Sequence, residues 1–196
     1  MSSRKRYPVR IPRYAAGIRA QASRSESGRS WWAREWTHRL EAMGLKGRLG
    51  RGKNYALSGQ VVSLAIAGPH VEAKVQGTRP EPYLVTLDFR LPEGAARAKL
   101  VAALRAEPMR VARLLADDLP QDVSDLFRAA GFDLFPGGKL GPGRYDMTSA
   151  CSCPDYANPC KHAAAVLILL GEEVARRPLT LLELRGILPE DLCDED

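Results

Sequence analysis

Three cysteines and one histidine lie within twelve consecutive residues, and their side chains are the ones in this chain best suited to chemistry. One residue separates Cys151 from Cys153, and one residue separates Cys160 from His162. Residues spaced in this way in a strand or tight turn point to the same side, so each pair can supply one edge of a tetrahedron. Four ligands of the thiolate and imidazole type are typical of zinc. The spacing therefore predicts a Zn²⁺ site formed by these four side chains.

The surroundings of the four residues favour a structural metal site. Pro154 and Pro159 bracket the connector between the two pairs and reduce the entropy that is lost when the loop closes. Cys160 begins a predicted helix over residues 160–174, whose N-terminal dipole favours the thiolate form that binds metal. Four protein ligands leave no open position for water or substrate, so we expect no catalytic residues and no enzymatic activity.

Other roles for clustered cysteines fit the spacing less well. A thiol redox pair is usually spaced C-x-x-C, and a c-type haem site requires C-x-x-C-H, whereas a single residue separates the cysteines of the first pair here. The fourth cysteine, Cys193, stands alone in an acidic tail, and its role stays open.

Basic residues are concentrated at the front of the chain. Residues 1–60 contain 14 Lys or Arg and three Asp or Glu, whereas residues 151–196 contain four and nine. This asymmetry, together with the excess of Arg over Lys, favours a polyanionic or acidic partner for the N-terminal region. A solvated arm that only aids solubility is the alternative.

The segment 45–55 is rich in Gly and basic residues and predicts a flexible loop that contacts phosphates. Arg48, Arg51 and Lys53 are the nucleic-acid-binding residues that we expect there. A plain solvated linker fits the segment equally well. The segment lacks the complete GxxxxGK[ST] pattern, so we do not expect a nucleotide-binding loop.

Residues 30–43 predict a helix that Ser30 caps and Gly44 ends. Its apolar stripe, Trp32, Trp36, Leu40 and Met43, is typical of a helix docked on a core. An aromatic platform for bases, or a surface for a partner groove, is the alternative.

The rest of the chain indicates an α+β fold with a small antiparallel sheet, followed by the metal site and C-terminal helices. Strands are predicted at residues 61–66, 71–75 and 83–89, and helices at residues 93–106, 109–119, 121–130 and 180–188. Asp117, Asp118, Asp122 and Asp125 surround a helix start, where acidic residues are favoured without any metal, and His70 is expected to be an inert turn residue.

The Pro- and Gly-rich segment 136–143 predicts a boundary. We expect a basic extended arm at residues 1–29, an α+β unit at 30–135, the metal site with its helices at 136–188, and an acidic, frayed tail at 189–196. Loss of metal should then loosen residues 145–175 and leave residues 59–130 folded. The longest apolar run has eight residues and no apolar signal core follows the N-terminus, so we expect a cytoplasmic protein without a membrane partner.

The string CSCPDYANPCKHAAAVL resembles the SWIM-type zinc finger, whose pattern is C-x-C-x(n)-C-x-H opening onto a helix. Further segments resemble bacterial SWIM zinc finger family proteins, namely SWWAREW, GRGKNYALSGQV, VQGTRPEPY, LFPGGKL and LLELRGI. The resemblance implies zinc as the cofactor, with Cys151, Cys153, Cys160 and His162 at the ligand positions. It also implies DNA-binding or protein-interaction roles, often beside helicase-like ATPases of the SWI/SNF class.

These observations together predict a non-enzymatic zinc-binding module that contacts the DNA backbone, is accessory to a helicase-like ATPase, or does both. No small-molecule substrate is expected. The alternative is a protein–protein interaction adaptor without nucleic-acid contact, in which the finger and the Trp-containing helix bind a partner.

Overall fold

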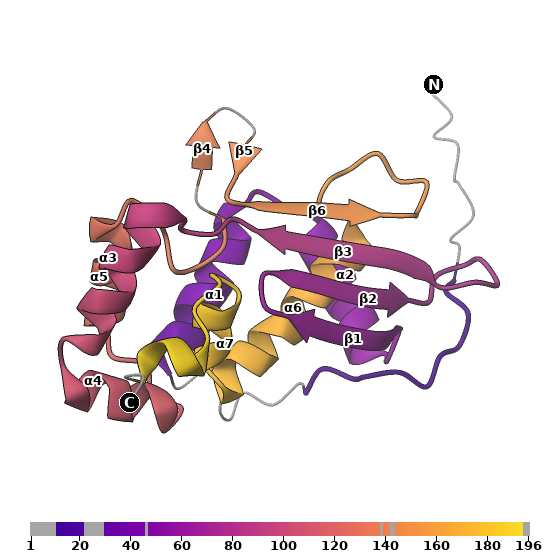
Figure 1. Cartoon of the computed structure of the whole chain (residues 1–196). Coiled ribbons are helices and arrows are strands. Elements are labelled where there is room, and N and C mark those ends of the chain that lie inside the picture. Colours follow the sequence, from indigo (N-terminus) through magenta and orange to yellow (C-terminus); the bar gives the residue numbers. More distant parts are fainter. Residues whose placement is uncertain (1–10, 22–29, 46, 138, 142–143, 194–196) are drawn as a thin grey trace.

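Helices cover one face of a four-stranded antiparallel sheet, which confirms the predicted α+β class (Figure 1). The computed structural model describes residues 11–21, 30–45, 47–137, 139–141 and 144–193. The helices are α1 (Trp31–Ala42), α2 (Gly47–Leu57), α3 (Gly94–Arg105), α4 (Pro108–Leu115), α5 (Asp122–Ala129), α6 (Lys161–Arg176), α7 (Leu179–Glu183) and the 3-10 helix η1 (Pro189–Leu192). The strands are β1 (Val61–Ala67), β2 (His70–Val75), β3 (Tyr83–Phe89), β4 (Lys139–Gly141), β5 (Arg144–Tyr145) and β6 (Met147–Cys151).

The sheet has the order β1-β2-β3-β6 and includes the three strands that the sequence predicts. Alternation along β2 buries Val71, Ala73 and Val75 against the helices and exposes the residues between them. The fourth strand, β6, comes from the metal-binding segment and pairs with β3, with Cys151 opposite Val85. Sequence reasoning missed β6 because its residues, MTSAC, show little of the β-branched, alternating pattern of a strand.

Helix α6 is the centre of the helical layer, and nine of its sixteen residues are buried. Helix α1 packs on it as the Trp stripe predicts: Trp36 is 2% exposed, and its indole Nε1 donates to the carbonyl of Leu167 at 3.1 Å. Gly171 makes this possible, because a Cβ there would lie 2.4 Å from that nitrogen. The buried stripe is therefore a core-docking surface and not a platform for bases.

The predicted flexible loop at residues 45–55 is wrong, because residues 47–57 form helix α2. Its glycines serve close packing instead of flexibility. A Cβ at Gly52 would lie 2.6 Å from the Cβ of Ala164 on α6, so only glycine allows the two helices to approach this closely. Tyr55 and Ala56 are buried on the same side of α2.

The described part of the predicted N-terminal arm, residues 11–21, lies along β1 and the end of α2. Backbone hydrogen bonds join Gly17 to Gly59, Ile18 to Val61, and Ala20 to Ala56. The edge of β1 is therefore partly covered by this segment. The remaining residues of the expected arm, 1–10 and 22–29, lie outside the described residues.

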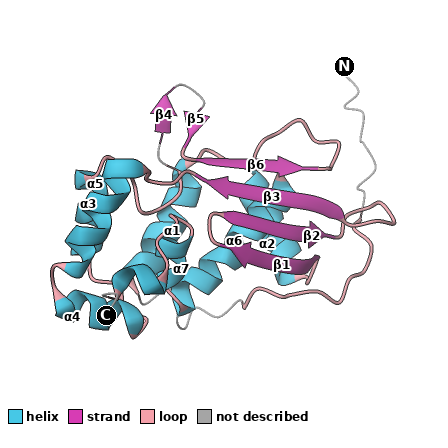
Figure 2. Ribbon diagram, viewed as in Figure 1, coloured by secondary structure: helices cyan, strands magenta, loops and turns pink. Residues whose placement is uncertain are grey.

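Helices α3, α4 and α5 form a group at one end of the sheet, as Figure 2 shows. Three of the acidic side chains near the start of α5 are held by arginines, namely Asp118 by Arg113, Asp122 by Arg110, and Asp125 by Arg128. His70 opens β2, and its Nδ1 lies 2.6 Å from a carboxylate oxygen of Asp88 on β3.

The expected fraying of the acidic tail is not seen at residues 189–193. Residues 189–192 form η1, Leu192 is 3% exposed, and Asp191 binds Arg97 of α3 with a distance of 2.7 Å between nitrogen and oxygen. Residues 194–196 lie outside the described part of the chain.

A buried arginine joins segments from both sides of the predicted boundary at residues 136–143. Arg185 is 1% exposed and donates to the carboxylate of Asp146 at 2.5 Å, and to the carbonyls of Arg90, Leu134 and Phe135. Residues from both sides of the boundary also share one hydrophobic cluster. No described helix is long and apolar enough to cross a membrane.

Candidate metal centre

The four predicted ligands come from two elements that the fold brings together. Cys151 ends β6 and Cys153 follows it, whereas Cys160 is the N-cap of α6 and His162 lies in its first turn. One ligand atom from each residue lies within 4.8 Å of all the others. The Nδ1 atom of His162 is 3.7 Å from the sulfur of Cys151 and 3.8 Å from the sulfur of Cys160. A tetrahedral zinc ion separates sulfur and nitrogen ligands by about 3.6 Å, so the observed spacing fits.

Charge in the cluster is arranged to receive a cation. The pKa of Cys160 is lowered to about 3, chiefly because its sulfur accepts a hydrogen bond from Cys151, with help from His162 and from backbone N–H groups at the start of α6. The pKa of Cys151 is raised by the same hydrogen bond and by burial. The pKa of Cys153 is also raised, mainly by burial. One thiolate thus sits beside two thiols whose protons a divalent cation can replace.

Aromatic rings hold the imidazole in place. His162 is 2% exposed, and the rings of Tyr55 on α2 and Tyr83 on β3 lie 5.1 and 4.7 Å from it, centroid to centroid. Its Nε2 is buried and has no hydrogen-bond partner among the described residues. The packing therefore fixes the ring with Nδ1 toward the sulfurs, a task that a hydrogen bond to the second nitrogen performs in many metal sites.

The loop between the two pairs of ligands is tied to the sheet. Asn158 donates from its side-chain amide to the carbonyl of Ser149 at 2.7 Å and also pairs with the hydroxyl of Ser149. Asp155 accepts a hydrogen bond from the backbone N–H of Ala157, and Pro159 is buried. Between these anchors Tyr156 is fully exposed.

Comparison with known proteins agrees with this geometry. Residues 144–171 match the SWIM zinc finger. The chain is also 37% identical over 193 residues to an uncharacterized protein of Mycobacterium tuberculosis, Rv2102, in a match that covers 98% of this chain and 68% of that protein. The chain belongs to the SWIM zinc finger family. No solved structure matches it. Zinc is the metal of this SWIM finger, and its Cys₃His donor set fits that ion.

The structure does not place the three predicted nucleic-acid contacts on one surface. All three lie on α2, where successive side chains are rotated by about 100°. Arg48 and Arg51 fall on the side of the helix that carries Tyr55, next to the finger. Lys53 is about 200° away from Arg51 and points to the opposite flank. None of the three is in an ion pair with a described acidic residue.

Helix α2 also removes any resemblance of this segment to a nucleotide-binding loop. Residues 47–53 keep the spacing of two glycines and a lysine, but Asn54 follows where such a loop has Ser or Thr. Because the segment is helical and Gly52 packs against Ala164, its backbone N–H groups are not free to surround a phosphate.

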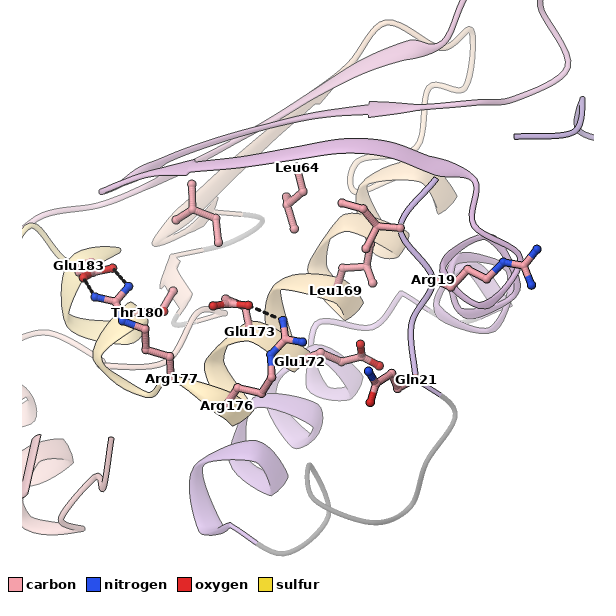
Figure 3. A pocket seen from close by; sticks show the side chains of 12 residues that line it. Arg19, Gln21, Leu64, Leu169, Glu172, Glu173, Arg176, Arg177, Thr180 and Glu183 are labelled. Carbon is pink, nitrogen blue, oxygen red and sulfur yellow. Dashed lines mark hydrogen bonds and ion pairs between the residues drawn. The ribbon is translucent and has the colours of Figure 1, made fainter. Parts of the chain in front are cut away.

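A pocket lies at the C-terminal end of α6, and its lining differs from that of the metal centre (Figure 3). Its volume is about 400 Å³, and its described lining contains no cysteine, histidine or serine. Four of its charged side chains neutralise one another in the pairs Arg176–Glu173 and Arg177–Glu183. The finger, where ligand atoms converge, is thus the stronger candidate site.

Sequence reasoning missed the residues that contact the finger but lie far from it in sequence. Tyr55 and Tyr83 hold the histidine, and the cations of Lys161 and Arg79 lie 5.8 Å from the centres of these two rings. Tyr55 lies in the segment 45–55, for which the sequence predicts a loop, and Tyr83 starts a predicted strand. No local pattern in either segment indicates a contact with the histidine, because both contacts arise from tertiary packing.

Proposed function

We propose that this protein is a non-enzymatic, zinc-stabilised module that binds the nucleic-acid backbone, with DNA as the ligand we expect. The observation that supports this most directly is the basic side of α2 beside the finger. Helix α2 contains no acidic residue, and Arg48 and Arg51 lie on the side of Tyr55, which packs on His162. Lys161 adds a further positive charge above the ring of Tyr55. Contacts of Arg and Lys with phosphates supply affinity without reading sequence.

The residues of the chain would perform this role by holding a basic surface in a fixed position. Cys151, Cys153, Cys160 and His162 would hold the zinc ion, which when bound cross-links β6 to the start of α6. Gly52 lets α2 pack closely on α6, and Tyr55 extends that packing to His162. The position of the basic residues on α2 is thereby coupled to the finger.

The resemblance to SWIM proteins supports a place beside a helicase-like ATPase, to which this module would bring nucleic-acid affinity. A purely protein-binding adaptor is the competing function, and the same experiment separates the two. Absence of any salt-dependent DNA binding by the full chain, with co-purification of a protein partner from native cells, would favour the adaptor.

The test is a titration of a fluorescent 20-base-pair DNA at several salt concentrations, followed by fluorescence anisotropy. The double variant Arg48→Gln, Arg51→Gln should weaken binding and lower the slope of log affinity against log salt by about 1.8, or about 0.9 for each lost phosphate contact. The single variant Arg51→Gln should lower the slope by about 0.9, and Lys53→Gln, which also removes one positive charge but from the opposite flank, is its matched control. Equal losses from both sides of α2, or none from either, would contradict the proposed surface.

A further inference from the structure

The tip of the finger presents an aromatic side chain that the fold does not use. Tyr156 has a relative exposure of 104%, so its ring packs against nothing among the described residues. The loop that carries it is nevertheless held on both sides, by Cys153 and Cys160 at the cluster and by Asn158 on Ser149. A fixed loop with a free aromatic ring is an arrangement suited to stacking on a planar group.

Two cations flank the same finger. The ammonium of Lys161 lies 5.8 Å from the ring centre of Tyr55, and the guanidinium of Arg79 lies 5.8 Å from the ring centre of Tyr83. Because both rings contact His162, both cations lie close to the metal cluster. Tyr156 is three residues from Cys153, so its Cα lies within about 11 Å of that ligand. Lys161 and Arg79 thus flank the metal cluster, and the loop that carries Tyr156 extends from the same cluster into solvent.

Two exposed acidic side chains near the tip would repel a polyanion. Asp155 is exposed next to Tyr156, although its carboxylate is partly engaged by the N–H of Ala157. Glu81 is exposed two residues after Arg79. Three thiolates around a zinc ion would add a formal charge of −1, which Lys161 and Arg79 would offset. Lys161 and Arg79 could therefore serve the structure by balancing the charge of the zinc site. The exposed ring of Tyr156 has no such structural role.

We propose that the finger tip binds an unpaired nucleic-acid strand, with Tyr156 stacked on a base and Lys161 and Arg79 on the flanking phosphates. This inference rests on the proposed nucleic-acid function and specifies the form of its ligand. An unpaired strand is favoured over a duplex because stacking requires a base with a free face, which bases inside a duplex do not have. The shared chemistry, a base and a phosphodiester, occurs in DNA and in RNA, and the test separates them.

The experiment measures binding of the zinc-loaded full chain to fluorescent dT12, rU12 and a 20-base-pair duplex. Tyr156→Ala should weaken binding of the preferred single strand by about 5- to 150-fold, since stacking of a base on an aromatic side chain contributes about 1–3 kcal/mol. Tyr156→Phe keeps the ring and should bind as the native protein does. Asp155→Asn removes a repulsive charge and should tighten binding. The zinc content of each variant, measured in parallel, shows that the finger is intact.

The outcomes separate this inference from the proposed function. If Tyr156→Ala binds both single strands as tightly as the native chain, or loses duplex and single-strand affinity equally, the stacking role is overturned while duplex binding through α2 can stand. If the native chain binds none of the three probes at low salt, both proposals fail. A loss confined to the single strands, with Tyr156→Phe unaffected, supports the inference.

Discussion

The buried polar groups around Arg185 and around His162 are satisfied in opposite ways. Around Arg185 a guanidinium at 1% exposure meets one carboxylate and three carbonyls, so the chain supplies every partner itself. Around His162 three sulfurs and an imidazole nitrogen converge on a common point, and complete compensation comes only from a cation. The polar groups around Arg185 are thus satisfied by the chain alone, whereas those around His162 depend on an ion.

The two polar centres join distant parts of the chain into one core. Arg185 lies two residues after the end of α7 and joins the segments LFPGGKL and LLELRGI, because it donates to the carbonyls of Leu134 and Phe135. The finger joins β6 to α6, and α6 packs against α1, α2 and the sheet. Each polar centre therefore fixes a junction between segments far apart in sequence.

Removal of a zinc ligand should have the largest effect. Cys160→Ser or His162→Ala is expected to abolish stoichiometric zinc binding and to lower the free energy of unfolding by about 5 kcal/mol or more, since structural zinc contributes about 10 kcal/mol in isolated fingers. Because Gly52 packs on Ala164, we expect faster amide exchange in α2 and β6 as well as in α6. Metal analysis, chemical denaturation and hydrogen exchange measure the three effects.

That experiment also decides how the regions are joined. The boundary predicted at residues 136–143 implies that residues 59–130 keep their protection when zinc is lost. The shared sheet and core imply that protection falls there too. Unchanged exchange rates in β1, β2 and β3 of the His162→Ala variant would support separable units and contradict coupling through the shared sheet and core.

Substitution at the other centre should cost somewhat less. Arg185→Met removes the cationic partner of the Asp146 carboxylate, which is 6% exposed and keeps a hydrogen bond from the N–H of Gly137, and it removes the donor to three carbonyls. Breaking a buried pair in this way costs about 3–5 kcal/mol. Urea denaturation measures the loss, and the zinc content of the folded variant should stay at that of the native chain. A variant that unfolds like the native protein would show that Arg185 does not hold this junction.

Asp191 gives the smallest expected effect and a pH dependence. Burial acts to raise its pKa, but the N–H of Leu188 and the charge of Arg97 outweigh burial, so its pKa is lowered in the folded state. Its stabilising contribution is therefore present above the pKa of an unfolded Asp and is lost as the pH falls through the lower, folded value. Asp191→Asn should cost about 1 kcal/mol at pH 7 and less at acidic pH. Denaturation curves at pH 7 and pH 3 test this, and a cost that grows on acidification would contradict it.

Elements that depend on local sequence could be predicted, and contacts between residues far apart in sequence could not. The ligand spacing, the hairpin at residues 61–75 and the stripe of Trp36 and Leu40 are determined within a few turns of chain, and the structure contains each of them. Helix α2 was missed because glycine is a weak helix former, and its use here depends on Ala164, more than a hundred residues away. The partners of Arg185 and the rings around His162 likewise come from tertiary packing, which no local pattern encodes.

Zinc binding by the four side chains can be measured by calorimetric titration of Zn²⁺ into the reduced, metal-free full chain, in two buffers of different ionisation enthalpy. We expect one zinc ion per chain and the release of about two protons, because the pKa of Cys160 is lowered while the pKa values of Cys151 and Cys153 are raised. Affinity should therefore fall by about 100-fold for each unit that the pH is lowered in the neutral range. Binding of much less than one equivalent, or equally tight binding by the Cys160→Ser variant, would contradict the claim that these four side chains form the metal centre.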